Sequence, residues 1–187
     1  MKIKQMIVDA DICIKIGMSD KHLFLENLFP SIAEKIYIHR VVYDEIIVPA
    51  CAKRQLDNML RSGSLEMLDE SGLSQVEMMV YQATYDMLKN VMIDKRNPNK
   101  NNGEVCSLAM AKAKSIPVFA SDEKELQPIV DEKLNTGIDN IICIRIIDIV
   151  KKIKNGELSG LTRKEAKILW VISGNKKDWY DNSIWPI

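Results

Sequence analysis

The segment IKQMIVDAD, residues 3–11, decides the fold class. Its first part, from Ile3 to Val8, is a short apolar run that ends at two acidic residues, Asp9 and Asp11. Such a run suits a parallel strand that is buried on both faces of a sheet. The segment therefore predicts a buried parallel strand whose carboxyl end delivers Asp9.

Further strands and helices alternate along the chain. Strands are predicted at 35–38, 116–120 and 141–144, whereas 65–68 fits either a strand or a short helix. Helices are predicted from apolar spacing at 12–28 with an interruption at Gly17, and at 41–48, 55–60, 74–91, 104–115, 122–134, 146–153 and 162–172. This alternation predicts a three-layer α/β/α fold with a central parallel sheet.

The length of 187 residues suits one substantial core and is short for two domains of ordinary size. We expect an α/β domain over residues 1–154 and a C-terminal helical extension over 155–187 that packs on it. The four cysteines form no CxxC pair, which disfavours a zinc ribbon or a redox motif. Because the chain also shows no signal peptide and no membrane-spanning run, a cytoplasmic protein without a membrane partner is expected.

The charges of the chain cancel. Lys and Arg number 26, and Asp and Glu also number 26, so the formal net charge is zero. This balance excludes a global basic field of the kind that draws a protein to nucleic acid. Any contact with RNA or DNA must therefore be local.

Acidic side chains stand where a parallel sheet gathers its ligands, at the carboxyl ends of strands. Asp9 and Asp122 each follow a predicted strand, and Glu104 follows a glycine at a helix start. Glu45 joins them if its helix turns that face inward. Clustered carboxylates without histidine suit Mg²⁺ or Mn²⁺, which can activate water for attack on a phosphodiester.

Together these segments resemble the PIN domain, a nuclease family. The resemblance runs from about residue 1 to 150 and rests on four segments in order, VDAD (8–11), VYDEI (42–46), NGEV (102–105) and ASD (120–122). It implies a parallel sheet, dependence on Mg²⁺ or Mn²⁺, and hydrolysis of RNA by a metal-dependent endoribonuclease. It also implies that Asp9, Glu45, Glu104 and Asp122 are the catalytic acids, with Asp9, Glu104 and Asp122 as metal ligands. Asp11 is either a fifth ligand or a helix cap.

The chain departs from the compact toxin members of that family in its length, its basic loop before Glu104 and its C-terminal helix and tail. A toxin with an antitoxin partner, an RNA-processing enzyme, a module bound to another protein through the tail, and a homodimer are all compatible with these residues. Four cations are candidates for guiding an RNA backbone: Arg40, Lys95, Arg96 and Lys100. Tail aromatics such as Trp170 and Trp179 either stack on bases or, as we favour, pack the tail.

Two other functions remain open. The Asp9-Ala10-Asp11 segment after a strand also resembles the nucleophile and acid of haloacid-dehalogenase phosphatases, with Asp9 as nucleophile. The third hypothesis is a non-catalytic binding module that keeps the fold. Each acid taken alone also fits a helix cap, a first-turn acid or surface charge, so only their joint order favours a metal site.

Overall fold

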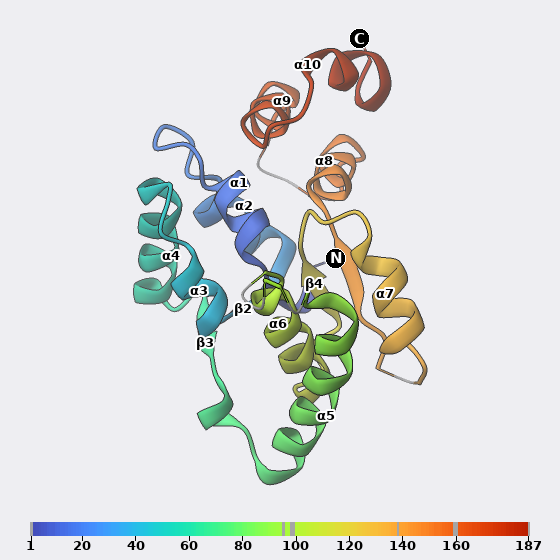
Figure 1. The fold of residues 1–187 in the computed structure, drawn as a ribbon. Coiled ribbons are helices and arrows are strands. Elements are labelled where there is room, and N and C mark those ends of the chain that lie inside the picture. Colours follow the sequence, from blue (N-terminus) through green and yellow to red (C-terminus); the bar gives the residue numbers. More distant parts are fainter. Residues whose placement is uncertain (1, 95, 98–99, 138, 159–160, 187) are drawn as a thin grey trace.

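The computed structural model describes residues 2–94, 96–97, 100–137, 139–158 and 161–186 (Figure 1). These residues form one sheet of five parallel strands in the order β3-β2-β1-β4-β5. The strands are β1 (Ile3–Val8), β2 (Ala33–His39), β3 (Glu66–Leu68), β4 (Val118–Ala120) and β5 (Ile142–Ile144). The segment 65–68, which fitted either a strand or a short helix, thus contains the strand β3, because its backbone pairs with β2 at the sheet edge.

Helices connect the strands and cover both faces of the sheet (Figure 1). The α-helices are α1 (Ala10–Ile16), α2 (Phe24–Ile32), α3 (Arg40–Glu45), α4 (Ala50–Ser62), α5 (Gln75–Met92), α6 (Asn102–Ala113), α7 (Leu126–Lys133), α8 (Ile146–Lys154), α9 (Arg163–Ile172) and α10 (Lys177–Trp179). Single turns are η1 (Glu70–Gly72) and η2 (Tyr180–Ile184). The predicted three-layer α/β/α fold is therefore confirmed.

Alternate side chains of the central strand enter two separate cores, as the period of a strand requires. Met6 and Val8 of β1 pack in the core that α1, α2, α4, α8 and α9 share. Ile7, between them, packs in the second core with α5, α6 and α7. All three side chains are fully buried, which explains the apolar run at the end of the strand.

The C-terminal extension shares the first core instead of standing apart. Leu169 and Trp170 of α9, together with Tyr180, are buried in the same cluster as Val8. The ring of Trp170 lies 5.2 Å from that of Trp179 and 6.5 Å from that of Tyr180. Packing of the tail on the α/β layers, expected from its aromatics, is thus present for Trp170 and Tyr180, whereas Trp179 stays exposed.

Several predicted helices differ in extent from the observed ones: α4 begins five residues before the predicted 55–60, and residues 17–23 separate α1 from α2 within the predicted 12–28. Two further differences have a local cause. The helix expected over 41–48 ends at Glu45, because Val48 precedes Pro49 and the residue before a proline is biased towards extended backbone. The helix expected from residue 122 begins only at Leu126. Hydrogen bonds from Arg145 and Ile146 to Asp122 hold that loop outside the helix.

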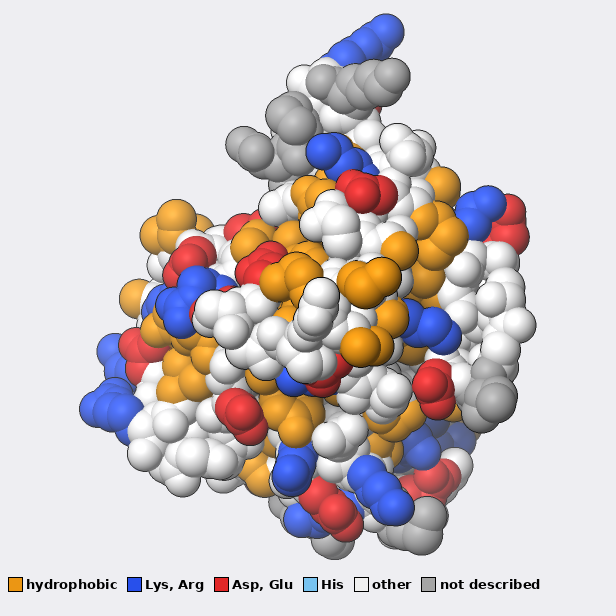
Figure 2. Space-filling view, turned by 90° about the horizontal axis from the view of Figure 1, so that it is seen from below, with side chains coloured by type: hydrophobic (Ala, Val, Ile, Leu, Met, Phe, Trp, Pro, Cys, Tyr) orange, Lys and Arg blue, Asp and Glu red, His pale blue; other side chains and the backbone are white. Residues whose placement is uncertain are grey.

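The surface carries no broad field of one sign in the view from below, where acidic, basic and apolar side chains are interspersed (Figure 2). Helix α5 exposes apolar side chains, with Met79 at 68% and Val76 at 71% exposure. A membrane-crossing helix, which needs a long apolar stretch, is not found within the residues described above.

Strand order creates a crevice at one position. The connection from β1 leads to β2 on one side, and the chain later returns to β4 on the other side of β1. Val8 is in register with both Ile38 and Ala120, so the three strands end level. In open parallel sheets, such a switch in strand order is where ligands bind, outside the carboxyl ends.

Candidate active site

Asp9 lies at this switch point. Its backbone N–H donates to the Ala120 carbonyl at 2.9 Å and continues the ladder between β1 and β4. Its side chain is 1% exposed, and the buried Ser121 hydroxyl donates to Oδ2 at 3.4 Å. Asp9 occupies the N-cap position of α1, but its side chain accepts no hydrogen bond of capping geometry from the described residues of that helix. Capping alone therefore does not account for its burial.

The buried carboxyl of Asp9 keeps its proton up to a pH far above the usual range for an aspartate. Burial, which penalises the charged form, and repulsion by Glu104 raise its pKa to about 8. Asp11 adds to this rise in pKa, while the N–H groups of Ala10 and Asp11 partly offset it. Without a cation beside it, Asp9 is therefore largely a neutral acid at pH 7.

Glu104 lies in the first turn of α6 and is half-buried. Burial raises its pKa, and repulsion by Glu123 and Asp11 acts in the same direction. Its own backbone N–H and the nearby Lys100 lower the pKa in part. The acids that raise the pKa of Glu104 are therefore Glu123 and Asp11.

Glu45 reaches the same place from the end of α3. A Cβ at Gly103 would lie 2.7 Å from Glu45 Oε2, so the carboxylate rests against the glycine backbone. The residue as a whole is exposed, but desolvation of this end raises its pKa, and so does Glu104. The glycine of the NGEV segment therefore makes room for the second predicted acid.

Asp122 and Asp11 are held differently, by an ion pair. Lys15 Nζ donates to Asp11 Oδ2 and to Asp122 Oδ2, both at 2.8 Å. Asp122 Oδ1 also accepts from the Ile146 N–H at 3.2 Å, and Arg145 Nε lies 3.9 Å from the same oxygen. These two carboxylates therefore already have a cationic partner.

The structure thus brings the predicted acids to one edge but not into one coordination sphere. Glu104 lies close enough to Asp9 and Glu45 to raise their pKa values, while Asp122 lies across Lys15 from Asp11. In the described part of the chain, no group of three or more His, Cys, Asp or Glu side chains is arranged so that it could hold a metal ion. The donor set suits Mg²⁺ or Mn²⁺ chemically, since it consists of carboxylate oxygens. As the side chains stand, however, the Lys15 ammonium occupies the position between two of them.

Sequence reasoning missed three residues of the site. Ser121 stood inside a motif segment, Glu123 adjoins Asp122, and Lys15 follows Asp11 by four residues, the spacing of a helical ion pair. The last spacing was the one usable signal. That Lys15 also reaches Asp122, 107 residues away, depends on the fold alone.

The cations predicted to guide RNA are placed unequally. Lys100 lies near Glu104 and helps to line a hollow with it, whereas Arg40 Nε donates to Asp69 Oδ2 at 3.0 Å. Arg96 is exposed, and Lys95 lies outside the described residues. His39, at the end of β2, is buried and caps α3 by accepting from the Val41 N–H, so it does not face a phosphate.

Comparisons of the chain with models of protein families, with curated proteins and with solved structures find no match. The resemblance to the PIN domain accordingly stays a prediction. What the chain does has to be argued from the geometry and chemistry of this edge.

Proposed function

We propose that the chain is a metal-dependent endoribonuclease that hydrolyses RNA at the edge formed by Asp9, Glu45, Glu104 and Asp122. The observation that carries the proposal is Asp9, a carboxyl with 1% exposure and a pKa raised to about 8, at the switch point of a parallel sheet. Burial of a carboxyl beside other carboxyls destabilises the fold. Strongly perturbed acids of this kind concentrate at functional sites.

Asp9, Glu104 and Asp122 would hold Mg²⁺ or Mn²⁺. The bound ion would supply activation of water and stabilisation of charge on the phosphodiester. Glu45 lies at the outer rim, where its raised pKa suits it to take a proton from the attacking water. Gly103 positions the Glu45 carboxylate for that role.

Lys15 has to give way when a divalent cation binds. Its ammonium now contacts both Asp11 and Asp122, and its side chain is 31% exposed, so it can turn outward. Once turned, its positive charge would lie near the phosphates of a substrate. Asp11 would then be free to act as a further ligand or to stay paired with Lys15.

The test is cleavage of end-labelled RNA, both single-stranded and structured, with Mn²⁺ or Mg²⁺ and with EDTA. We expect shorter RNA chains with either cation and none with EDTA. Asp9→Asn should lower the cleavage rate on the order of 100-fold or more, since it removes a charged ligand. Asp86→Asn, an exposed position on α5, is the matched control and should cleave like the wild type.

Undiminished cleavage by Asp9→Asn would contradict the proposal. Release of inorganic phosphate from a phosphomonoester, with RNA chains left intact, would instead support the phosphatase with Asp9 as nucleophile. RNA binding that EDTA does not change, without cleavage by either cation, would support the non-catalytic module.

A further inference from the structure

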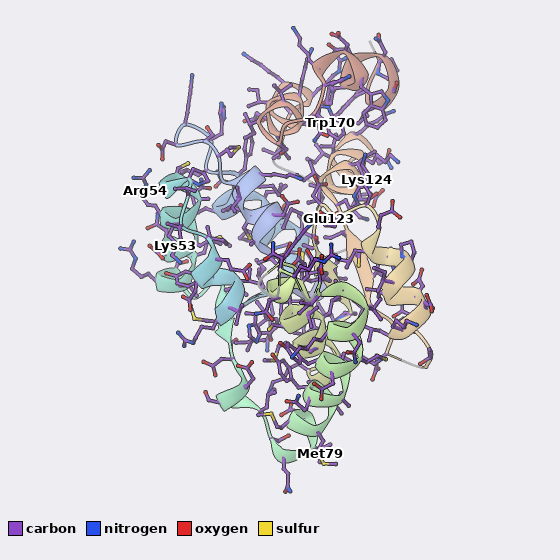
Figure 3. All side chains as sticks on the ribbon, in the orientation of Figure 1. Lys53, Arg54, Met79, Glu123, Lys124 and Trp170 are labelled. Carbon is purple, nitrogen blue, oxygen red and sulfur yellow. The ribbon has the colours of Figure 1, made fainter. Side chains whose placement is uncertain are left out.

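A second hollow is lined by Asp122 but not by Glu104, and it lies between the C-terminal extension and the loop after β4. It has a volume of about 290 Å³. The residues of its lining that matter here are Asp122, Lys124, Arg145, Trp170, Lys176 and Trp179. Lys124 and Trp170, both labelled in Figure 3, line this hollow from the loop after β4 and from α9.

One wall of the hollow is aromatic. Trp170 is 3% exposed, and its Nε1 donates to the Lys176 carbonyl at 3.0 Å, which fixes the ring. Trp179 packs on Trp170 at 5.2 Å between ring centroids with an angle of 33°, yet remains 45% exposed. A fixed tryptophan therefore supports an exposed one, which is the arrangement of a stacking platform.

The other walls are basic. Lys124 and Lys176 are exposed, and neither forms an ion pair with a residue in the described ranges. Arg145 is 28% exposed, and the one acid of the lining, Asp122, is already paired with Lys15. The hollow is therefore locally positive in a chain whose net charge is zero.

We infer that this hollow binds one nucleotide of a single-stranded RNA, with its base on Trp179 and its phosphate beside Lys124 and Lys176. The combination of a stacking ring with free cations matches a planar base joined to an anion. The volume, close to 300 Å³, suits one small-molecule-sized group. This inference rests on the proposed function, because Asp122 belongs to both places and the next phosphodiester would therefore lie towards Asp9 and Glu104.

The test measures binding apart from chemistry. A fluorescent single-stranded RNA of roughly ten nucleotides, long enough to fill such a site, is titrated in EDTA with the full chain, and anisotropy is recorded at several salt concentrations. Trp179→Ala should raise the Kd about 10-fold, with an unchanged salt dependence. Lys124→Ala with Lys176→Ala should also weaken binding and lower the slope of log K against log salt by about 0.7, because both lysines contact the same phosphate and one phosphate contact is lost.

Lys177→Ala is the matched control, because Lys177 adjoins Lys176 but does not line the hollow. It should change neither the Kd nor the salt slope. Since Trp179 packs on Trp170, thermal unfolding is measured for Trp179→Ala. The lysine pair, whose side chains are exposed, keeps the test valid if that variant is destabilised.

The outcomes separate this inference from the proposed function. RNA bound through Trp179 and the two lysines, without cleavage by any divalent cation, supports the hollow and overturns the nuclease. Metal-dependent cleavage together with wild-type RNA binding by both variants overturns the hollow alone. Tighter binding of DNA of the same sequence than of RNA would also overturn the assignment to RNA. Free nucleotide should displace the labelled RNA from the hollow, and a failure to do so would overturn the assignment as well.

Discussion

Two pairs of carboxyl groups at the same edge of the sheet are kept in opposite states. Asp9 and Glu104 have raised pKa values, caused first by burial, and the charge of Glu104 raises the pKa of Asp9 further. Asp11 and Asp122 share the ammonium of Lys15 at 2.8 Å. The comparison teaches that position at a strand end does not decide the charge of an acid. Its neighbours do: Lys15 forms ion pairs with Asp11 and Asp122, whereas Asp9 and Glu104 form none with the residues that the structure describes.

The largest expected effect comes from replacing Asp9, one of the two acids that Lys15 does not contact. Its pKa is about 8 in the folded protein, against 3.8 for an aspartate in water, so the folded state keeps a proton that the unfolded chain releases. Stability from this group is therefore complete below pH 3.8 and is lost as the pH rises to about 8. One unit of pKa corresponds to about 1.4 kcal/mol. At pH 8 the free energy of unfolding of Asp9→Asn should therefore exceed that of the wild type by about 2 to 5 kcal/mol.

The measurement is urea unfolding in EDTA at several values of pH from acid to pH 9. The advantage of Asp9→Asn should shrink steadily towards acid pH, whereas Asp86→Asn should show no such trend. A variant no more stable than the wild type at pH 8 would show that the strain ascribed to Asp9 is absent. Together with lost cleavage, a stability gain is the pattern of a residue kept for function.

A second, smaller effect tests how Gly103 positions the carboxylate of Glu45 near Glu104. Gly103→Ala favours a helix by about 0.5 to 1 kcal/mol in general, but here its Cβ would lie 2.7 Å from Glu45 Oε2. The displaced carboxylate should slow cleavage about 10-fold while the fold remains, which is read from RNA cleavage and far-UV circular dichroism. Gly72→Ala is the control, because nothing lies within 4 Å of a Cβ there.

The explanation can be checked by a double variant. If the contact with Glu45 is the cause, Gly103→Ala should cost little further activity in a chain that already carries Glu45→Ala. A full additional loss in that background would point to Val42, whose Cγ2 would lie 3.1 Å from the same Cβ.

The fold could be predicted because its signals are local. The apolar run of β1, the capping box of Ser74 and Glu77 at the start of α5, and the alternation of strands and helices are all properties of neighbouring residues. The sequence could not decide between a strand and a helix for β3, because three residues carry little periodicity and the pairing partner lies on β2. Helix α3 was predicted too long: Pro49 disfavours helical backbone at Val48, but the apolar spacing of Ile46 and Ile47 does not show that the helix ends at Glu45.

The positions of the candidate acids could be predicted, but their pairing could not. Strand ends and a helix start located Asp9, Asp122 and Glu104, since these positions converge in any parallel sheet. Which acids are paired could not be predicted, because Lys15 meets Asp122 only after folding. The same holds for the hollow at Trp179, which combines residues of the loop after β4 with residues of the tail.

The smallest expected effect comes from the ion pairs of Lys15 with Asp11 and Asp122. Lys15→Gln removes the ammonium that Asp11 and Asp122 share. Exposed or half-exposed ion pairs contribute about 0.2 to 1 kcal/mol each, so the loss of two pairs should lower the free energy of unfolding by about 0.4 to 2 kcal/mol. The affinity for Mn²⁺, measured by calorimetry, should rise roughly 5-fold, because the divalent cation no longer competes with a fixed positive charge. Lys151→Gln on α8 should change neither quantity. A lower Mn²⁺ affinity in Lys15→Gln would mean that the lysine holds Asp11 and Asp122 in place for the cation, and the two pairs of carboxyl groups would then be one preorganised site.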